Sequence, residues 1–163
     1  MKRKIFTFVL CGAIVLTVLF IFSQSLLGVS ASQKESGSVL KAVSPVLEVF
    51  VGRGNVTDHL VRKLAHFTEF FALGAELSVL LWVRGAVGVQ RYLNGLFAGA
   101  AVALCDETVQ LFTGRGSQVQ DVWLDIFGAV CGLLFVALLR ALAAAFKARR
   151  QGWPKKQPEQ GNN

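Results

Sequence analysis

Four long apolar runs dominate the pattern of hydrophobic and polar positions along the chain. They cover residues 5–22, 64–83, 92–112 and 122–142. Each is close to the ~20 residues that a helix needs to cross the hydrocarbon core of a bilayer. The pattern predicts an all-α fold, an integral membrane bundle of four transmembrane helices that occupies residues 1–142 as one domain.

A shorter segment between the first two runs also has helical periodicity. Apolar residues recur at helical spacing through residues 39–50, although Pro45 would weaken a helix interior. We expect a short extracytoplasmic helix, or a kinked pair of turns, lying on the outer membrane surface. Thr57 or Asn55 is placed to cap the second long helix, which should begin before its apolar run.

The C-terminal segment, residues 143–163, differs from the rest of the chain. It is basic, and from Gln151 onward it is polar and lacks apolar periodicity. Segments of this composition cannot bury enough apolar surface to fold. We predict a basic, disordered cytoplasmic tail.

The composition fits a membrane protein better than a soluble one. Apolar residues make up 53% of the chain and charged residues 17%, against roughly 25% charged in a soluble domain. The net charge of +7 comes from basic residues that flank the apolar runs without interleaved aromatics, so we expect the lipid bilayer and no nucleic acid as a partner. The three cysteines lie inside apolar runs, which argues against a disulfide framework or a zinc site.

The distribution of basic residues predicts the orientation in the cell membrane. Lys and Arg accumulate in cytoplasmic loops. With four spans, both termini and the central loop share one side, which holds 11 of the 17 basic residues: Lys2, Arg3, Lys4, Arg84, Arg91, Arg140, Lys147, Arg149, Arg150, Lys155 and Lys156. We therefore expect a multi-pass protein with cytoplasmic N- and C-termini.

An alternative for the N-terminus is a secretory signal peptide. A basic start, an apolar run and Val29-Ser30-Ala31 resemble a signal with a cleavage site. The apolar run over residues 5–22 is longer than the usual signal core of about 7–15 residues. We favour an uncleaved first helix, and cleavage would leave the outward placement of the following segment unchanged.

Ionisable residues gather at the outward ends of three predicted spans. Because such residues inside spans are costly, they mark function by default. The second span begins near Arg62, His66 and Glu69, which share one helix face, and the third ends with Asp106 and Glu107. The start of the fourth span and the loop before it add further polar residues. The candidate ligand-binding residues are therefore Arg62, His66, Glu69, Asp106, Glu107, Gln110, Arg115, Ser117, Asp121 and Asp125. Glu76 lies deeper, near mid-membrane, and should face other helices or be protonated.

Several chemistries remain open for this cluster. A His–carboxylate pair can act as acid and base, so the candidate catalytic residues are His66, Glu69, Asp106 and Glu107, although no motif fixes a reaction. Carboxylates with a histidine can also hold a divalent cation, but no motif fixes a metal set, and we assign no metal ligand and no cofactor. Arg115 in a glycine-flanked loop can take a phosphate or carboxylate bidentately. This combination suits a polar headgroup at the outer leaflet.

Three ordered blocks of sequence resemble the VanZ-like membrane protein family. They are RKLAHFTEFFALG at residues 62–74, DETVQLF at residues 106–112, and Arg115-Gly116-Ser117 followed by Asp121, Asp125 and Gly128. Phe22-Ser23-Gln24-Ser25 also resembles the serine-rich end of the family's first helix. Phe70 departs from the pattern, because the family commonly has tyrosine there. The family is named for a protein that gives low-level resistance to the glycopeptide teicoplanin, so the resemblance implies an envelope role without supplying a reaction.

Three hypotheses for the function follow from these observations. In the leading one, the cluster binds a polar or anionic envelope ligand, such as a lipid-linked cell-wall precursor or an amphiphilic glycopeptide, and contributes to teicoplanin resistance. In the second, the protein is an enzyme that modifies a lipid headgroup or precursor, with Asp106, Glu107 and Asp121 as candidate metal ligands. In the third, the buried charges only fix helix register in a structural or partner protein. A proton-coupled transporter is weaker, because only Glu76 reaches mid-depth.

Overall fold

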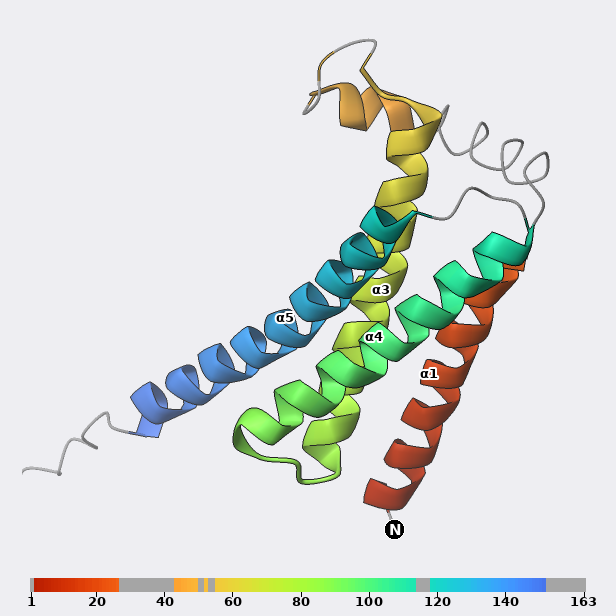
Figure 1. Cartoon of the computed structure of the whole chain (residues 1–163). Coiled ribbons are helices and arrows are strands. Elements are labelled where there is room, and N and C mark those ends of the chain that lie inside the picture. The colour runs from red at the N-terminus through yellow and green to blue at the C-terminus, as the bar shows by residue number, and fades with distance from the viewer. Residues whose placement is uncertain (1, 27–42, 50–51, 53–54, 114–117, 152–163) are drawn as a thin grey trace, which may run out of the picture.

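The computed structural model describes residues 2–26, 43–49, 52, 55–113 and 118–151. The secondary structure within these ranges is helical. Its long helices are α1 (Lys2–Leu26), α3 (Asp58–Val83), α4 (Gly88–Thr113) and α5 (Val119–Gln151), as Figure 1 shows. Each contains a stretch long and apolar enough to cross a membrane. The prediction of four long apolar helices is therefore confirmed.

The start of α3 follows the capping chemistry expected from the sequence. Thr57 is the N-cap residue, and its Oγ1 accepts a hydrogen bond from the backbone N–H of Leu60 at 3.2 Å. The cap starts α3 at Asp58, well before the apolar run. Residues 43–49 are also helical, with Pro45 in the first turn, where proline is tolerated. The remainder of the predicted short helix, residues 39–42 and 50, lies outside the described residues.

The end of α5 differs from the prediction. We expected disorder from residue 143 onward, but α5 continues to Gln151, so that expectation was wrong for residues 143–151. Alanine is the strongest helix former, and it occupies positions 143–145 and 148. Arg149 and Arg150 in the last turn also stabilise the negative end of the helix dipole. The rest of the predicted tail lies outside the described residues.

Hydrogen bonds between helix ends show which ends lie together in the bundle. At one end, the Arg3 side chain of α1 donates through Nε to the Val83 carbonyl oxygen of α3 at 2.9 Å. At the other, the Thr113 hydroxyl of α4 donates to the Ser25 carbonyl oxygen of α1 at 3.1 Å. We call the end where α3 and α5 begin the acidic end and the opposite one the basic end. In Figure 1 the acidic end is at the top, and α3 contacts all three other long helices.

Glycines bring α5 very close to α3. A Cβ atom at Gly128 would lie 2.7 Å from the Phe67 carbonyl oxygen, and one at Gly132 would collide with the Phe71 backbone. Small residues allow such approach between helices. Asp125 lies on the same face, so this packing sets its distance from α3.

The bundle buries polar as well as apolar residues and exposes large apolar side chains. The buried residues include several polar ones, namely Ser25, Ser78, Asp106, Glu107, Gln110 and Asp125. Large apolar side chains are instead widely exposed on all four long helices, among them Phe8 at 81% and Phe112 at 88%. The interior therefore combines an apolar core, which includes Ile21, Phe70 and Leu73, with buried polar groups, and the outer surfaces of the helices are apolar.

Candidate functional site

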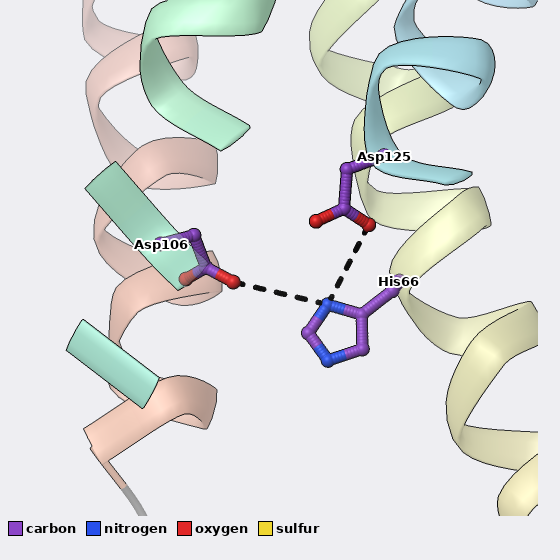
Figure 2. Close-up of side chains that lie close together, drawn as sticks. All are labelled: His66, Asp106 and Asp125. Atoms are coloured by element: carbon purple, nitrogen blue, oxygen red, sulfur yellow. Dashed lines mark ion pairs between the residues drawn. The ribbon is translucent and has the colours of Figure 1, made fainter. Parts of the chain in front are cut away.

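His66 is the centre of the polar cluster at the acidic end. Its Nδ1 lies 4.0 Å from Glu69 Oε2, one turn along α3. The same nitrogen lies 4.0 Å from Asp106 Oδ2 on α4 and 4.0 Å from Asp125 Oδ1 on α5. Figure 2 shows the two aspartates approaching the imidazole from different helices. Three helices thus place acidic groups around one ring nitrogen.

Asp106 is completely buried, and a short chain of polar side chains fixes it. Its Oδ2 accepts a hydrogen bond from the Gln110 side-chain amide at 2.8 Å, one turn along α4. The same amide nitrogen lies at hydrogen-bond distance, 3.2 Å, from Ser25 Oγ on α1. Since Ser25 is also buried, the end of α1 takes part in orienting an acid on α4.

Asp125 has a different environment, although it is equally buried. Its residue exposure is 1%, yet neither carboxylate oxygen accepts a hydrogen bond from the part of the chain that the structure describes. Asp125 Oδ1 lies 4.0 Å from His66 Nδ1. A buried polar group without a hydrogen bond is costly, so Asp125 requires a functional or chemical explanation.

A pocket of about 310 Å³ opens beside this cluster. Its deeper wall includes Asp125, Glu107 and Gln110, which are buried, together with half-buried His66. More accessible residues form its rim, namely His59, Arg62, Lys63, Gln118 and Asp121. The pocket therefore combines basic groups at its mouth with acids deeper inside.

Ion pairs hold the two rim cations. Arg62 Nε lies 3.3 Å from Asp58 Oδ2 within α3, and Lys63 Nζ lies 3.1 Å from Asp121 Oδ1 on α5. These side chains are about one-third exposed, and ion pairs at accessible sites contribute only about 0–1 kcal/mol. A stronger anionic group entering the pocket can therefore displace the carboxylate partners.

The structure brings together most of the residues singled out from the sequence. Two of them, Arg115 and Ser117, lie outside the described residues. The eight others form the cluster around His66 or line the pocket: Arg62, His66, Glu69, Asp106, Glu107, Gln110, Asp121 and Asp125.

Our sequence analysis missed four contributing residues. His59, Lys63 and Gln118 line the pocket, and Ser25 joins the hydrogen-bond chain. Positions 59, 63 and 66 are spaced four and three residues apart, which is the spacing of one helix face. That periodicity was the available signal. No pattern in the sequence indicated the pairing of Ser25 with α4.

Glu76 belongs to a different contact. The hydroxyl of Thr17 on α1 donates a hydrogen bond to Glu76 Oε1 at 3.1 Å. Glu76 thus faces another helix, as its mid-helix position predicted. It does not line the pocket.

Three donor atoms in the cluster are close enough to be considered as a metal site. One ligand atom each from His66, Asp106 and Asp125 lies within 4.8 Å of the others. From the sequence we assigned no metal ligands, and the metal-assisted alternative named Asp106, Glu107 and Asp121. The structure groups a different set, which shares only Asp106 with that alternative.

A scan against protein-family models matches residues 6–140 to the family described as VanZ/LLP1. The match covers most of the chain, including all three sequence blocks and the residues of the pocket. A search of curated proteins and a search of solved structures find no match. Further conclusions about the site therefore depend on its geometry.

Proposed function

The chain belongs to the VanZ-like family, and we propose that it is an envelope protein that binds the polar headgroup of an amphiphile at the outer leaflet. The observation that carries this proposal is the pocket at the acidic end. Its mouth includes the basic residues Arg62 and Lys63, its deeper wall includes buried acids, and the surrounding helices have apolar outer surfaces. An amphiphile with a charged head and an apolar tail matches both surfaces.

Insertion into the bilayer is supported by the exposed apolar surface. Soluble proteins rarely expose apolar patches larger than a few hundred Å². In the most apolar window of α1, only 6% of residues are buried inside the structure. Helices satisfy their own backbone hydrogen bonds, which is the requirement for crossing hydrocarbon.

The orientation we propose places the acidic end outside the cell. The described termini of α1 and α5 at the basic end carry Lys2, Arg3, Lys4, Lys147, Arg149 and Arg150, and such clusters remain in the cytoplasm. Cysteine labelling in a background without native cysteines tests it. Gln118→Cys should react with an impermeant maleimide in intact cells, and Lys147→Cys only after permeabilisation. The reverse pattern would contradict the orientation.

The rim and the deeper wall suit different parts of one headgroup. Arg62 and Lys63 can exchange their carboxylate partners for a phosphate or carboxylate of the ligand. Buried Glu107 and Asp125 on the deeper wall provide acceptors for hydroxyl or amino groups. A lipid-linked cell-wall precursor and an amphiphilic glycopeptide both present such mixed heads on apolar bodies.

A binding experiment with defined lipids tests the headgroup proposal. Purified protein in phosphatidylcholine nanodiscs is titrated with a polyprenyl phosphate and, separately, with the uncharged polyprenol. We expect preference for the phosphate, and a loss of about tenfold or more with Arg62→Ala and Lys63→Ala together, since hydrogen bonds to charged groups contribute about 1.5–3 kcal/mol. Arg149→Ala, an exposed charge at the basic end, is the matched control. Equal binding of both lipids, or unchanged affinity in the double variant, would refute the proposal.

The implied link to teicoplanin is tested in cells. In a host where the protein lowers teicoplanin susceptibility, Glu69→Ala and Asp106→Ala should abolish the effect while membrane expression stays normal. Full protection by both well-expressed variants would exclude a role of the cluster in resistance.

One observation favours an enzyme as the second candidate. His66 Nδ1 is equidistant from three carboxylates, and a His–carboxylate pair can transfer protons during catalysis. Release of inorganic phosphate from polyprenyl phosphates by the wild type, lost in His66→Ala, would support catalysis. Binding without turnover would favour the first proposal.

A further inference from the structure

We propose that His66, Asp106 and Asp125 bind a divalent transition-metal cation at the deep wall of the pocket. This inference concerns the pocket of the proposed function, but it depends on the geometry of the three side chains and not on headgroup binding. The ligands are His66 Nδ1 and one oxygen from each aspartate, and they come from α3, α4 and α5 (Figure 2).

The distances require only small side-chain movements. Zn²⁺ binds imidazole nitrogen and carboxylate oxygen at about 2.0–2.2 Å, which in a tetrahedron separates the ligand atoms by about 3.4 Å. His66 Nδ1 lies 4.0 Å from each aspartate oxygen, and the three atoms lie within 4.8 Å of one another. Shifts of roughly an ångström or less close the set around a cation.

The unbonded oxygens of Asp125 point to such a ligand. This carboxylate is 1% exposed, and neither oxygen accepts a hydrogen bond within the described residues. Asp106 Oδ1 likewise accepts none there, while Asp106 itself is fully buried. A buried carboxylate is stable when it is paired or coordinates a metal. Two such groups facing one imidazole match the charge of a divalent cation.

The surroundings of the set also match those of known metal centres. Gln110 donates to Asp106 Oδ2 and is itself at hydrogen-bond distance from Ser25, so one ligand is oriented by an outer partner. His66 and Asp125 line the 310 Å³ pocket. A cation there would have three protein ligands and a coordination position open to the pocket, which is the arrangement of reactive rather than structural zinc sites.

The ligand types select the class of metal. Ca²⁺ takes 6–8 oxygen ligands, and Mg²⁺ keeps several waters in an octahedron of oxygens. An imidazole with two carboxylates suits transition metals, and Zn²⁺ binds such sites more tightly than Mn²⁺ or Fe²⁺. Zn²⁺ is therefore the probe for the test. The open position would accept a phosphate oxygen of the headgroup whose other oxygens contact Arg62 and Lys63.

Metal content of the full-length protein in detergent provides the direct test. The protein carries an affinity tag without histidines, is loaded with Zn²⁺, and is washed before elemental analysis. We expect about one Zn²⁺ per chain, removed by a chelator, and at least a tenfold loss of affinity in Asp125→Asn and Asp106→Asn. Glu76→Gln removes a half-buried carboxylate outside the pocket and should keep the metal. Less than about a tenth of a Zn²⁺ per wild-type chain, or unchanged binding in Asp125→Asn, would overturn the proposal.

Two readouts separate metal loss from misfolding. Zn²⁺ should raise the melting temperature of the wild type, because a ligand that binds the folded state stabilises it. It should leave that of chelator-treated Asp125→Asn unchanged. If the variants do not fold, Co²⁺ titration of the wild type decides alone: saturation at one site with the visible bands of a nitrogen–oxygen environment supports the site, and their absence overturns it.

A cross-comparison distinguishes this inference from the proposed function. The Arg62→Ala and Lys63→Ala double variant should keep its Zn²⁺ while losing polyprenyl phosphate affinity. Zn²⁺ binding in a protein that does not prefer polyprenyl phosphate would support the metal site and refute the headgroup proposal. Headgroup binding in a protein that binds no Zn²⁺ would do the opposite. Preferential binding of Ca²⁺ or Mg²⁺ would overturn the transition-metal assignment.

Discussion

The two ends of the helical bundle treat charged side chains in opposite ways. At the basic end, Arg3 donates to the carbonyl oxygen of Val83, Arg91 donates to that of Ala86, and Arg140 lies 4.0 Å from the centroid of the Trp82 ring. At the acidic end, Asp125 is buried without a hydrogen bond among the described residues, beside a pocket. These basic-end charges stabilise helix ends and contacts, whereas the buried carboxylate of Asp125 is held in a costly environment.

This difference separates structural charges from functional ones. A guanidinium that caps carbonyl groups or covers an aromatic ring has a sufficient structural role. A buried carboxylate with no donor contributes nothing to stability in that state, and such strain is typical of functional sites. Glu76 provides a comparison within the same bundle. It is an acid in the middle of a long apolar helix, but it accepts a hydrogen bond from Thr17 and does not line the pocket.

The largest effect is expected from replacing a glycine where α5 packs directly against the backbone of α3. Gly132→Leu would drive a side chain into the Phe71 carbonyl and the Ala75 amide of α3. Overpacking against backbone should destabilise the bundle by about 3 kcal/mol or more, and Asp125 should move away from His66. Thermal unfolding in detergent measures the change. Gly12→Leu is the control, since a Cβ there meets nothing within 4 Å, and equal melting temperatures for both variants would contradict the packing account.

Asp125→Asn directly tests the contrast between the charges at the acidic end and those at the basic end. With metal chelated, we expect this variant to be as stable as the wild type or about 1–2 kcal/mol more stable, because it removes a buried charge without a donor. The asparagine amide can also donate to neighbouring carboxylates. Denaturation in the presence of chelator provides the measurement. A clear loss of stability would instead favour the hypothesis that the cluster only fixes helix register.

Arg3→Ala tests the structural role of the basic end. It removes donors to the Val83 carbonyl that connect α1 with α3, and should lower stability by about 1 kcal/mol. Polyprenyl phosphate and Zn²⁺ binding should remain at wild-type levels. Lys2→Ala, an exposed neighbour, controls for charge. Weaker ligand binding in Arg3→Ala would show that the two ends are not functionally separate.

Thr17→Val should produce the smallest change. It deletes the hydroxyl that donates to Glu76 at 3.1 Å, for an expected loss of about 0.5–1.5 kcal/mol. Metal content should not change, because Glu76 lies outside the proposed ligand set. Thermal unfolding and elemental analysis of one preparation give both values. Loss of metal in this variant would extend the site beyond the acidic end.

The long helices and the acids and histidine of the cluster were predictable from the sequence, whereas the contribution of Ser25 was not. Apolar run length and local capping at Thr57 indicated the four long helices, because these signals depend on neighbours along the chain. Helix direction then assigned the ends of α3, α4 and α5 to one side of the bundle. The extension of α5 to Gln151 was missed, although the alanines at positions 143–145 and 148 favour a helix.

The way in which the polar side chains meet depends on how the helices pack. The approach of α5 to α3 at Gly128 and Gly132 sets the 4.0 Å distance from Asp125 to His66. The rotation of α1 and α4 joins Ser25 to Gln110. Such distances depend on how helices far apart in sequence pack and rotate, which hydrophobic periodicity does not encode. The lengths and directions of the helices therefore specify that the acids and His66 gather at the acidic end, and helix packing makes His66, Asp106 and Asp125 face a common point.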